Sequence, residues 1–455
     1  MFNKISLGVV LILAFMQLMV ALFPVSLVFN NKFDIFTQFF RFNLSCDVLT
    51  RVSLFSIGIV LFTVSLVARY IIKDSDLQSN FASLLLIALA GMNGVVLTRD
   101  IFSLYVFIEI TAVASVILIS FNKDIQALEK AFKYIIISAV ASTLMLAAIA
   151  LLMLLTGSTS LSTIAIALRI SGNDMLVKFA LGIFICGLFM KSGLMPFPGW
   201  LPDAYTAAYA PVSLFLAGIV TKVTGVYTLI RIVTSVFMPD NTVQHILMFV
   251  GVALIILGTL AALGQSDFKR MLAYSSISQI GYIILGFGCG TSLGLAAAVF
   301  HFFNHAIFKS LLFVNATAVE LQSGTRNMDK MSGLACRMKV TGITSLIASL
   351  SESGIPPLAG FWSKFLIIIA LGLSGHLVYA LIAILTSIIT AAYLFSLQRR
   401  VFFGKINKEF KDIKEASFSL SLPALILAGI IIFISLSSPF ILKDFILPIG
   451  NIIGG

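Results

Sequence analysis

Residues 190–203 of this 455-residue chain read MKSGLMPFPGWLPD, and this stretch decides the expected fold. A long apolar run ends at Lys191, and three prolines and two glycines then interrupt the helix. A second stretch, residues 352–364, reads ESGIPPLAGFWSK and repeats the design, with Glu352 in the place of Lys191. Both stretches carry Ser, Gly, an aliphatic residue, Pro, Gly and an aromatic residue in register. Paired broken helices in two halves of a membrane protein indicate a transport site near the bilayer midplane.

The composition predicts an all-α, polytopic transmembrane bundle. Hydrophobic residues make up 59% of the chain and charged residues 11%. Apolar runs of the length that spans a bilayer, about 20 residues, recur along the whole chain, and the alternating short segments of a transmembrane barrel are absent. We expect about 13 helices, with cores near residues 5–28, 48–72, 79–98, 100–121, 128–156, 175–194, 207–236, 243–264, 267–287, 291–322, 338–370, 376–401 and 417–446. The first run could instead be a signal peptide, but it has no clear small-residue cleavage site.

The connections between these helices set the expected orientation. The net charge of +11 could suggest a nucleic-acid partner. The basic residues, however, gather in alternate loops, including Lys4, Lys123, Lys269 and the segment 399–414. This positive-inside pattern predicts an integral protein of the cytoplasmic (inner) membrane, surrounded by the lipid bilayer, with a cytoplasmic N-terminus and no nucleic-acid partner. The segment 402–416 is expected to be a cytoplasmic loop or short surface helix, and residues 157–173 a short amphipathic piece on the outer face.

No pattern in the sequence indicates a cofactor or a metal. The four cysteines, Cys46, Cys186, Cys289 and Cys336, are far apart and follow no metal or haem spacing, so we expect them to be small buried hydrophobic residues. Neither a nucleotide-binding glycine motif between a strand and a helix nor a P-loop is present. The chain is therefore expected to hold no redox centre of its own.

Several ionisable residues fall inside hydrophobic segments, where a charge costs about 2.5–3.5 kcal/mol and usually marks an ion path. The candidate residues of this path are Glu109, Lys191, Lys222, His301, His305, Lys309, Glu352 and Lys364.

The alternative to an ion path is a structural role, and it differs between the candidates. Glu109, about ten residues into its helix, could simply pair two helices. Lys191 could snorkel from a helix end to the membrane surface, although the helix break beside it would admit water. Lys222 lies near the middle of a helix among threonines and glycines, which favours a hydrated position.

His301, His305 and Lys309 share one helix face, because they follow the spacing i, i+4, i+8. The rise from His301 to Lys309 is about 12 Å, so bridging waters would have to complete a proton wire. Two histidines one turn apart could also bind zinc, but no acidic third ligand lies nearby. Ser275, Ser276, Ser278 and Gln279 on the preceding helix could hold water or simply allow close helix packing.

The sequence resembles the antiporter-like membrane subunits shared by respiratory complex I, energy-converting membrane-bound hydrogenases and Mrp-type Na+/H+ antiporters. The similarity covers nearly all of the chain from the second predicted helix onward. The stretches that carry it are FIE at 107–109, MPF at 195–197, GWLPDA at 199–204, DFKRMLAYSSIS at 267–278, HAIFKSLLF at 305–313 and GIPPLAGF at 354–361.

The resemblance implies two inverted five-helix repeats, each with one broken helix. It divides the chain into N-terminal helices (1–78), a first repeat (79–236), a second repeat (243–401), and a cytoplasmic loop with a C-terminal helix (402–455). It also implies that Glu109 and Lys191 form an ion pair, that Lys222 and the histidines link the halves, and that Lys364 closes the path to the outside.

Two departures from the family pattern stand out. Family members usually have 14 helices, and this chain is expected to begin at the second. Glu352 is an additional carboxyl group, which could pair with Lys364 or alter ion choice. We also do not expect the long C-terminal lateral helix of the largest members.

The expected function is translocation of protons, or of Na+, by one subunit of a multisubunit membrane complex. Its partners would be other membrane subunits, including related antiporter-like subunits. A redox-driven pump of the complex I or hydrogenase type is preferred. The alternatives are a subunit of an Mrp-type antiporter and a scaffold subunit that transports nothing.

Overall fold

The structure is a computed structural model that describes residues 6–22, 44–171, 175–237 and 241–450. All regular elements in these ranges are helices, which confirms the predicted all-α class. Lys4 and the part of the first predicted helix beyond residue 22 lie outside the described residues.

Eleven helical segments in the described ranges are long and apolar enough to cross a membrane. Together with the shorter α1 and the pair α16 and α17, they account for the 13 predicted helices. The main elements are α1 (Leu7–Leu22), α4 (Val48–Ile71), α5 (Ser75–Leu97), α6 (Ile101–Ile119), α7 (Ile125–Thr156), α8 (Leu161–Ser171), α9 (Met175–Ser192), α10 (Trp200–Ala207), α11 (Ala210–Phe215), α13 (Asn241–Leu263), α14 (Phe268–Gly288), α15 (Ser292–Ser323), α16 (Lys339–Ser353), α17 (Ala359–Leu373), α18 (Leu377–Leu397) and α19 (Phe418–Leu436).

Three predicted helices are divided differently in the structure. The predicted helix 207–236 begins only at Ala210, after a separate α10, and 338–370 is two helices, as its prolines indicated. The last predicted helix, 417–446, stops at Leu436, and short helical turns follow it. The amphipathic piece expected at 157–173 is α8, and the polar segment 402–416 holds only the turn η7 (Lys408–Phe410).

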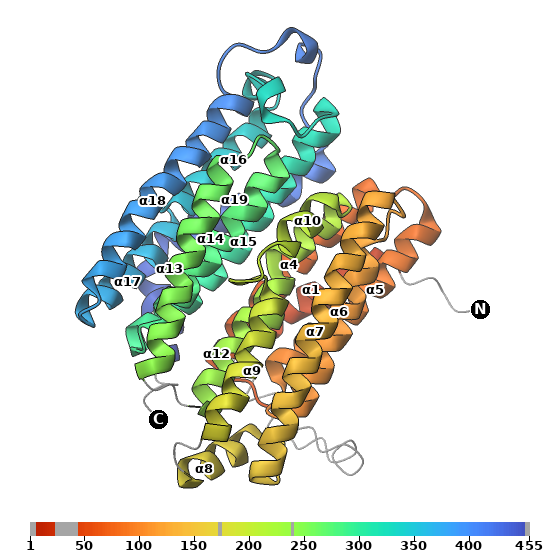
Figure 1. The fold of residues 1–455 in the computed structure, drawn as a ribbon. Coiled ribbons are helices and arrows are strands. Elements are labelled where there is room, and N and C mark those ends of the chain that lie inside the picture. Colours follow the sequence, from red (N-terminus) through yellow and green to blue (C-terminus); the bar gives the residue numbers. More distant parts are fainter. Residues whose placement is uncertain (1–5, 23–43, 172–174, 238–240, 451–455) are drawn as a thin grey trace.

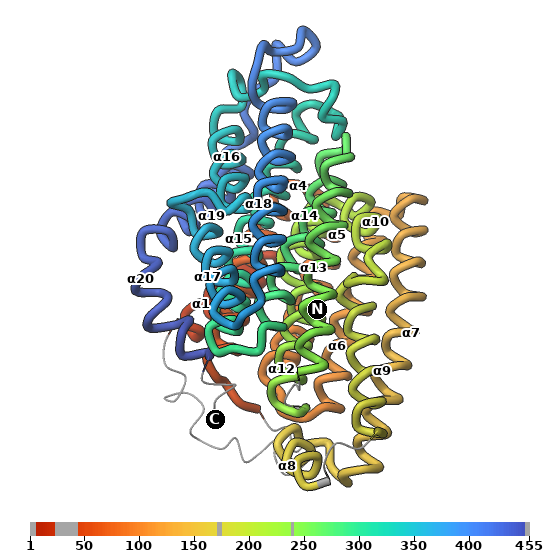
Figure 2. Tube along the Cα trace, turned by 60° about the vertical axis from the view of Figure 1, so that its left-hand side comes forward, coloured from red at the N-terminus to blue at the C-terminus, as the bar shows by residue number. Residues whose placement is uncertain are grey.

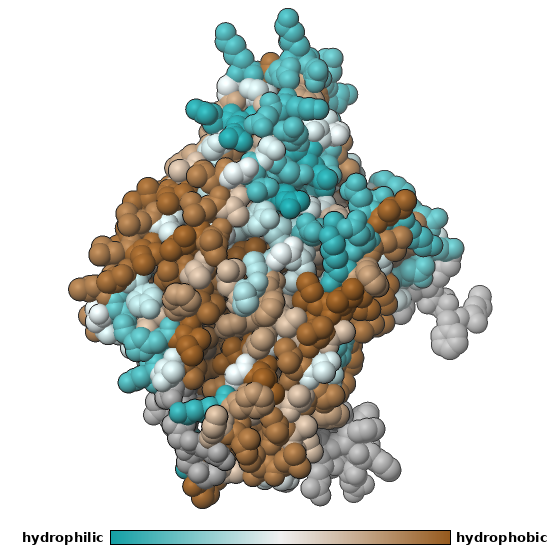
Figure 3. Space-filling view, viewed as in Figure 1, coloured by the Kyte–Doolittle hydropathy of each residue, from teal (hydrophilic) through white to brown (hydrophobic). Residues whose placement is uncertain are grey.

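The helices form two adjacent groups that run in a common direction (Figure 1). One group contains α5, α6, α7 and α9, and the other contains α13, α14, α16, α17 and α18. Figure 2 shows, from another side, α16, α17 and α18 together and α6, α7 and α9 together. Hydrophobic side chains cover the middle of the visible face, and hydrophilic ones gather at the end that carries residues 402–417 (Figure 3). This distribution fits a protein whose middle lies in lipid.

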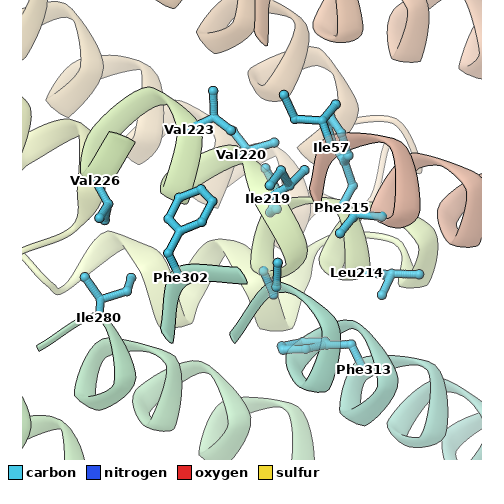
Figure 4. Packing of buried hydrophobic residues seen from close by; sticks show 14 of the residues in the cluster. Ile57, Leu214, Phe215, Ile219, Val220, Val223, Val226, Ile280, Phe302 and Phe313 are labelled. Atoms are coloured by element: carbon cyan, nitrogen blue, oxygen red, sulfur yellow. The ribbon is translucent and has the colours of Figure 1, made fainter. Parts of the chain in front are cut away.

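The centre of the molecule is built by α14, α15 and the segment Ala210–Phe237, whose spanning windows are 94% to 100% buried. These helices are hydrophobic on nearly all sides, as expected for helices that are surrounded by other helices. Figure 4 shows Phe302 of α15 projecting toward the helix that carries Val220 and Val223. The central helices therefore hold their few ionisable groups in an otherwise apolar core.

The segment Ala210–Phe237 departs from regular α geometry. It contains three π-helical parts, η1 (Leu216–Val220), η2 (Lys222–Tyr227) and η3 (Val233–Phe237), with α12 (Thr228–Ile232) between the last two. π-turns inside helices frequently occur at functional sites, and Lys222 is the first residue of η2. No sequence pattern indicated this irregularity.

Asp47 joins three elements at the end of the bundle opposite the polar loops. Its carboxylate accepts hydrogen bonds from Arg231 Nη1 at 2.6 Å and Nη2 at 2.8 Å, and from the backbone N–H of Thr50 at 2.8 Å. Arg99, between α5 and α6, lies 3.4 Å away. Burial alone would raise the pKa of Asp47, but the hydrogen bonds and the charge of Arg231 outweigh burial and hold this pKa well below its usual range.

The depressed pKa of Asp47 predicts a pH dependence of stability. A carboxylate with a lowered folded-state pKa stabilises the fold above its unfolded pKa, about 3.9 for Asp. That contribution is lost as the pH falls below this value. The melting temperature of the wild type should therefore fall more steeply than that of Asp47→Asn below about pH 4. Thermal unfolding in detergent across this range checks it; parallel curves would contradict it.

A glycine permits the closest contact between α9 and η2. A Cβ atom added at Gly225 would lie 1.6 Å from Ser192 Oγ and 3.0 Å from Ser192 Cα. Ser192 directly follows Lys191, and Gly225 lies one helical turn beyond Lys222. Two candidate lysines are therefore carried by backbones that touch with no side chain of residue 225 between them.

Gly225→Ala should destabilise the protein by about 1–3 kcal/mol, because the added methyl group forces α9 and η2 apart. Gly429→Ala in α19 is the matched control, since its added Cβ would meet no atom within 4 Å. Thermal unfolding of both purified variants tests this expectation, and equal melting temperatures would refute it.

Candidate functional site

The first helix break places Lys191 in the last turn of α9. The helix ends at Ser192, and Gly193 then adopts a left-handed φ of 64°. The prolines that follow have no N–H group to continue a helix, so α10 begins only at Trp200. Trp200 Nε1 donates a hydrogen bond of 3.0 Å to the carbonyl oxygen of Met190, which also accepts a longer bond of 3.3 Å from the backbone N–H of Gly193 at the break.

Lys191 forms an ion pair with Glu109 of α6. Lys191 Nζ lies 2.8 Å from Glu109 Oε1 and donates a second hydrogen bond of 2.6 Å to Ser138 Oγ. Ser142 Oγ donates to the same carboxylate oxygen at 2.6 Å. The side chain of Lys191 is only 1% exposed, so it does not snorkel to the surface, whereas that of Glu109 is 29% exposed. The pairing that the resemblance implied is present.

The second helix break carries an ion pair of the opposite arrangement. Glu352, in the last turn of α16, accepts hydrogen bonds from Lys309 Nζ of α15 at 2.8 Å and 3.0 Å. Both side chains are completely buried. Lys309 Nζ also donates to Ser275 Oγ of α14. A lysine occupies the first break and a carboxylate the second, and in each case a serine from a third helix contacts the lysine.

The partner of Glu352 differs from the one we expected. We predicted that Glu352 could pair with Lys364, but its carboxylate pairs with Lys309. Lys364 Nζ donates at 2.7 Å to the backbone carbonyl oxygen of Glu352 and lies 4.5 Å from the centre of the Tyr282 ring. A cation is stabilised at the carbonyl end of a helix, and the break exposes that end of α16 to Lys364.

Lys222 and the two histidines belong to neither ion pair. Lys222 is fully buried and donates to the carbonyl oxygen of Ala217. The rings of His301 and His305 stack with their centres 6.3 Å apart. The ring nitrogens of His301 contact Ser363 at 2.9 Å and Gln279 at 3.2 Å, and neither of these residues is a typical zinc ligand. Neither ring nitrogen of His305 has a hydrogen-bond partner among the described residues.

The structure gathers six of the eight candidate residues into one electrostatic cluster. Its members, related by direct contact or by through-space interaction, are Lys222, His301, His305, Lys309, Glu352 and Lys364. Glu109 and Lys191 form a separate pair, and within the described ranges no hydrogen bond joins that pair to Lys222. The two groups meet instead through the contact of Ser192 with Gly225.

The sequence analysis missed several polar residues around these pairs. Ser138 and Ser142 follow the spacing i, i+4 on a predicted helix, and this periodicity could have identified them. Ser363 and Tyr282 carried no such signal, because only the fold brings them to His301 and Lys364. The prediction for the cysteines was wrong in part: Cys289 is buried, but Cys336 is exposed.

Comparison with known proteins supports this assignment of the helices and breaks. Residues 98–390 match the family of transmembrane proteins described as NADH:quinone oxidoreductase/Mrp antiporter. The chain belongs to this family. The matched residues include both helix breaks and all eight candidate residues of the ion path, and the match confirms the resemblance inferred from the sequence.

Two relatives come from the two kinds of complex that the description of this family names. A subunit of the NADH-quinone oxidoreductase of Desulforudis audaxviator is 36% identical over 320 residues, which cover 70% of this chain and 64% of that protein. A subunit of the Na(+)/H(+) antiporter of Alkalihalophilus pseudofirmus is 33% identical over 333 residues, which cover 73% of this chain and 67% of that protein. The aligned part thus spans about two thirds of the length of these curated relatives.

Solved structures share the same arrangement of helices. A chain of an archaeal membrane-bound sulfane sulfur reductase complex superimposes with a TM-score of 0.87 at 28% identity, covering 98% of this chain and 92% of that one. A chain of the Mrp complex of a Dietzia species gives a TM-score of 0.89 at 24% identity, with the same coverage. A chain of respiratory complex I from Thermus thermophilus gives 0.84 at 20% identity, covering 99% and 94%. The fold is therefore that of the antiporter-like membrane subunits.

The buried pair of Lys309 and Glu352 predicts a non-additive effect on stability. Lys309→Met alone should destabilise the protein by about 3–5 kcal/mol, because it leaves a buried carboxylate without its partner. The double variant Lys309→Met with Glu352→Gln should recover most of that loss, since no charge then remains unpaired. Thermal unfolding of the single and double variants measures the difference, and additive losses would argue against it.

Proposed function

We propose that this chain is a proton-translocating subunit of a multisubunit complex in the cytoplasmic membrane, with its N-terminus on the cytoplasmic side. One observation carries the proposal: each of the two helix breaks holds a lysine–carboxylate pair inside the hydrophobic core of the bundle. Ionisable residues at this depth are costly, and they mark ion pathways more often than they serve as braces. The membership of the family supports the same function.

Each ion pair can act as a switch for proton binding. Opposite charges about 4 Å apart attract by about 4 kcal/mol at an effective dielectric constant of about 20. That energy equals about a thousandfold change in the proton affinity of the lysine. A movement of a few ångströms that separates Glu109 from Lys191 therefore favours release of the lysine proton. Helix breaks permit such a movement, because their backbone is not locked by a continuous hydrogen-bond ladder.

The proposed path runs from the first pair to the second. A proton released by Lys191 passes to Lys222, to His305 and then to Lys309 and Glu352, with Lys364 on the far side of the second break. Internal waters would bridge the gaps, and the unpartnered ring nitrogens of His305 are suitable contacts for them. The proposal includes the division into two inverted repeats, 79–236 and 243–401, since the fourth of five helices is broken in each.

The side chains along the path favour protons over Na+. Lysine and histidine exchange protons readily, but an ammonium group repels a metal cation and offers it no ligand. The two carboxylates on the path are each engaged by a lysine. A redox-driven complex and an Mrp-type antiporter remain the two settings for this transport, since relatives of both kinds match the chain.

Glu109 points to a protein partner in the membrane. Its carboxylate lies mid-helix, yet the side chain is 29% exposed at the flank formed by α6 and α7. A carboxylate in contact with acyl chains would be strongly unfavourable. We propose that another membrane subunit, of the antiporter-like kind, covers this flank in the assembled complex.

Glu109→Gln and Lys191→Ala should abolish proton transport by the complex, because each removes one half of the first switch. The assay is acidification of inverted membrane vesicles, measured with a pH-sensitive dye, in vesicles that contain equal amounts of assembled complex. Lys178→Ala is the matched control, since Lys178 is an exposed lysine on the same helix as Lys191. Unchanged acidification by both variants of the pair would refute the proposal.

Lys191→Arg separates transport from a scaffold role. Arginine preserves the charge and the ion pair but does not release its proton under these conditions. A subunit that only braces its partners should tolerate the substitution wherever the complex assembles. A proton carrier should lose transport, so normal acidification by an assembled Lys191→Arg complex would favour the scaffold.

A further inference from the structure

One face of α16 is polar along its whole length and leads from the end of the bundle to Glu352. Its members are Thr341, Thr344, Ser345, Ser349 and Glu352. These positions fall on one side of the helix and cover a rise of about 16 Å. All five side chains are buried, with at most 2% of each residue exposed. A continuous row of buried hydroxyl groups inside a membrane bundle requires an explanation.

At the outer end of this row lies a carboxylate from the polar loop. Glu415, between η7 and α19, accepts a hydrogen bond from Thr341 Oγ1 at 2.7 Å and from the backbone N–H of Val340 at 2.7 Å. Glu415 is partly exposed, so it connects the surface that carries residues 402–417 with the first hydroxyl of the row. In the proposed orientation this surface is cytoplasmic.

Two buried amide side chains face the middle of the row, and both retain unused hydrogen-bonding atoms. Asn315 of α15 accepts from Thr344 Oγ1 at 3.0 Å, and Gln398 after α18 donates to Ser345 at 2.8 Å and to Ser349 at 2.9 Å. The Nδ2 group of Asn315 and the Oε1 atom of Gln398 have no partner among the described residues. Both residues are at most 1% exposed.

The inner end of the row reaches the second ion pair through Tyr393. The hydroxyl group of Tyr393, on α18, lies close to Thr390 and Ser275 but makes no hydrogen bond of good geometry within the described part of the chain. Ser275 is the residue that contacts Lys309. Polar atoms without partners therefore recur at three positions between Glu415 and Glu352.

Water is the usual partner of such atoms. A buried polar group without a hydrogen bond costs about 1–3 kcal/mol, and protein interiors commonly satisfy these groups with ordered water. Three unpartnered groups beside a row of hydroxyls provide the two to four polar contacts that each buried water needs. The row therefore offers the kind of polar contacts that buried water binds.

We propose that the polar face of α16 is a proton entrance to the Glu352–Lys309 pair, with Glu415 as the proton-collecting carboxylate at its mouth. This inference rests on the proposed function, because it supplies protons to the same pairs. A proton that arrives along the water chain binds a carboxylate oxygen of Glu352. The ammonium group of Lys309 then loses its counter-charge and releases its own proton toward the far side of the second break, where Lys364 lies.

The rival explanation assigns these residues to packing alone. Glu415 would then only cap α16, whose first N–H groups have no partner within the helix, and the hydroxyls would only let neighbouring helices approach. Thr344 does bond the Val340 carbonyl at 2.9 Å within its own helix. Packing does not explain the unpartnered polar atoms of Asn315 and Gln398 beside this row, since apolar side chains of similar size would avoid that cost.

The experiment measures vesicle acidification by the assembled complex. Gln398→Leu and the double variant Ser345→Ala with Ser349→Ala should lower the rate severalfold, because each interrupts the polar row. Thr63→Val is the matched control: Thr63 is also buried, but among the described residues its hydroxyl bonds only to the Ile59 carbonyl within α4. Rates equal to this control in both variants, while Lys191→Ala abolishes transport, would overturn the entrance and leave the proposed function intact.

Glu415→Gln distinguishes proton collection from capping through its pH profile. The charged residues next to this contact in the chain are Lys339, which precedes Val340, and Lys414, which precedes Glu415. Arg400, after α18, pairs with Asp329 at 3.3 Å. A collecting carboxylate matters most when protons are scarce, so the rate deficit should grow as the pH rises and disappear as it falls. A deficit that is equal at every pH, or absent, would refute the collecting role. Normal transport by Lys191→Ala would instead refute the proposed function.

Discussion

The structure depends on one constraint: a charged side chain inside an apolar bundle needs a polar or oppositely charged partner. An unpaired ionised group at this depth costs several kcal/mol, so each buried lysine has to meet a carboxylate, a hydroxyl or a free carbonyl. The helix breaks supply these conditions. A break leaves backbone carbonyls unpaired, which is why Lys364 reaches the carbonyl oxygen of Glu352. It also ends the helix where a side chain from a neighbouring helix can approach.

The two halves meet this constraint with opposite charges. In the first half the lysine stands at the break and the carboxylate comes from α6. In the second half the carboxylate stands at the break and the lysine comes from α15. The second pair is also buried more completely than the first. A proton that binds near Glu352 therefore acts on a negative group at the end of a helix, where the helix dipole already disfavours negative charge.

The sequence predicted the helices, their number and both breaks, because apolar length and the prolines at 196 and 356 act locally. Seven of the eight candidate residues are buried, as it predicted, and Glu109 is partly exposed. It did not predict that Arg231 and Lys269 are buried as well. It could not assign partners, and Glu352 shows the reason: Lys364 is close in sequence, but Lys309 is close in space. The sequence did not predict the π-helical parts around Lys222 for a similar reason, since these parts depend on tertiary packing. The polar face of α16 was readable as a periodic pattern, but its hydroxyls resembled ordinary helix-packing residues until Asn315 and Gln398 were seen beside it.

The missing side chain at position 225 has a mechanical consequence. Ser192 rests directly on the backbone of η2, with no flexible group between them to absorb a displacement. A shift of the end of α9 toward η2 must consequently displace the helix that bears Lys222. Rigid contact, rather than a chain of hydrogen bonds, would then synchronise the first ion pair with the central lysine.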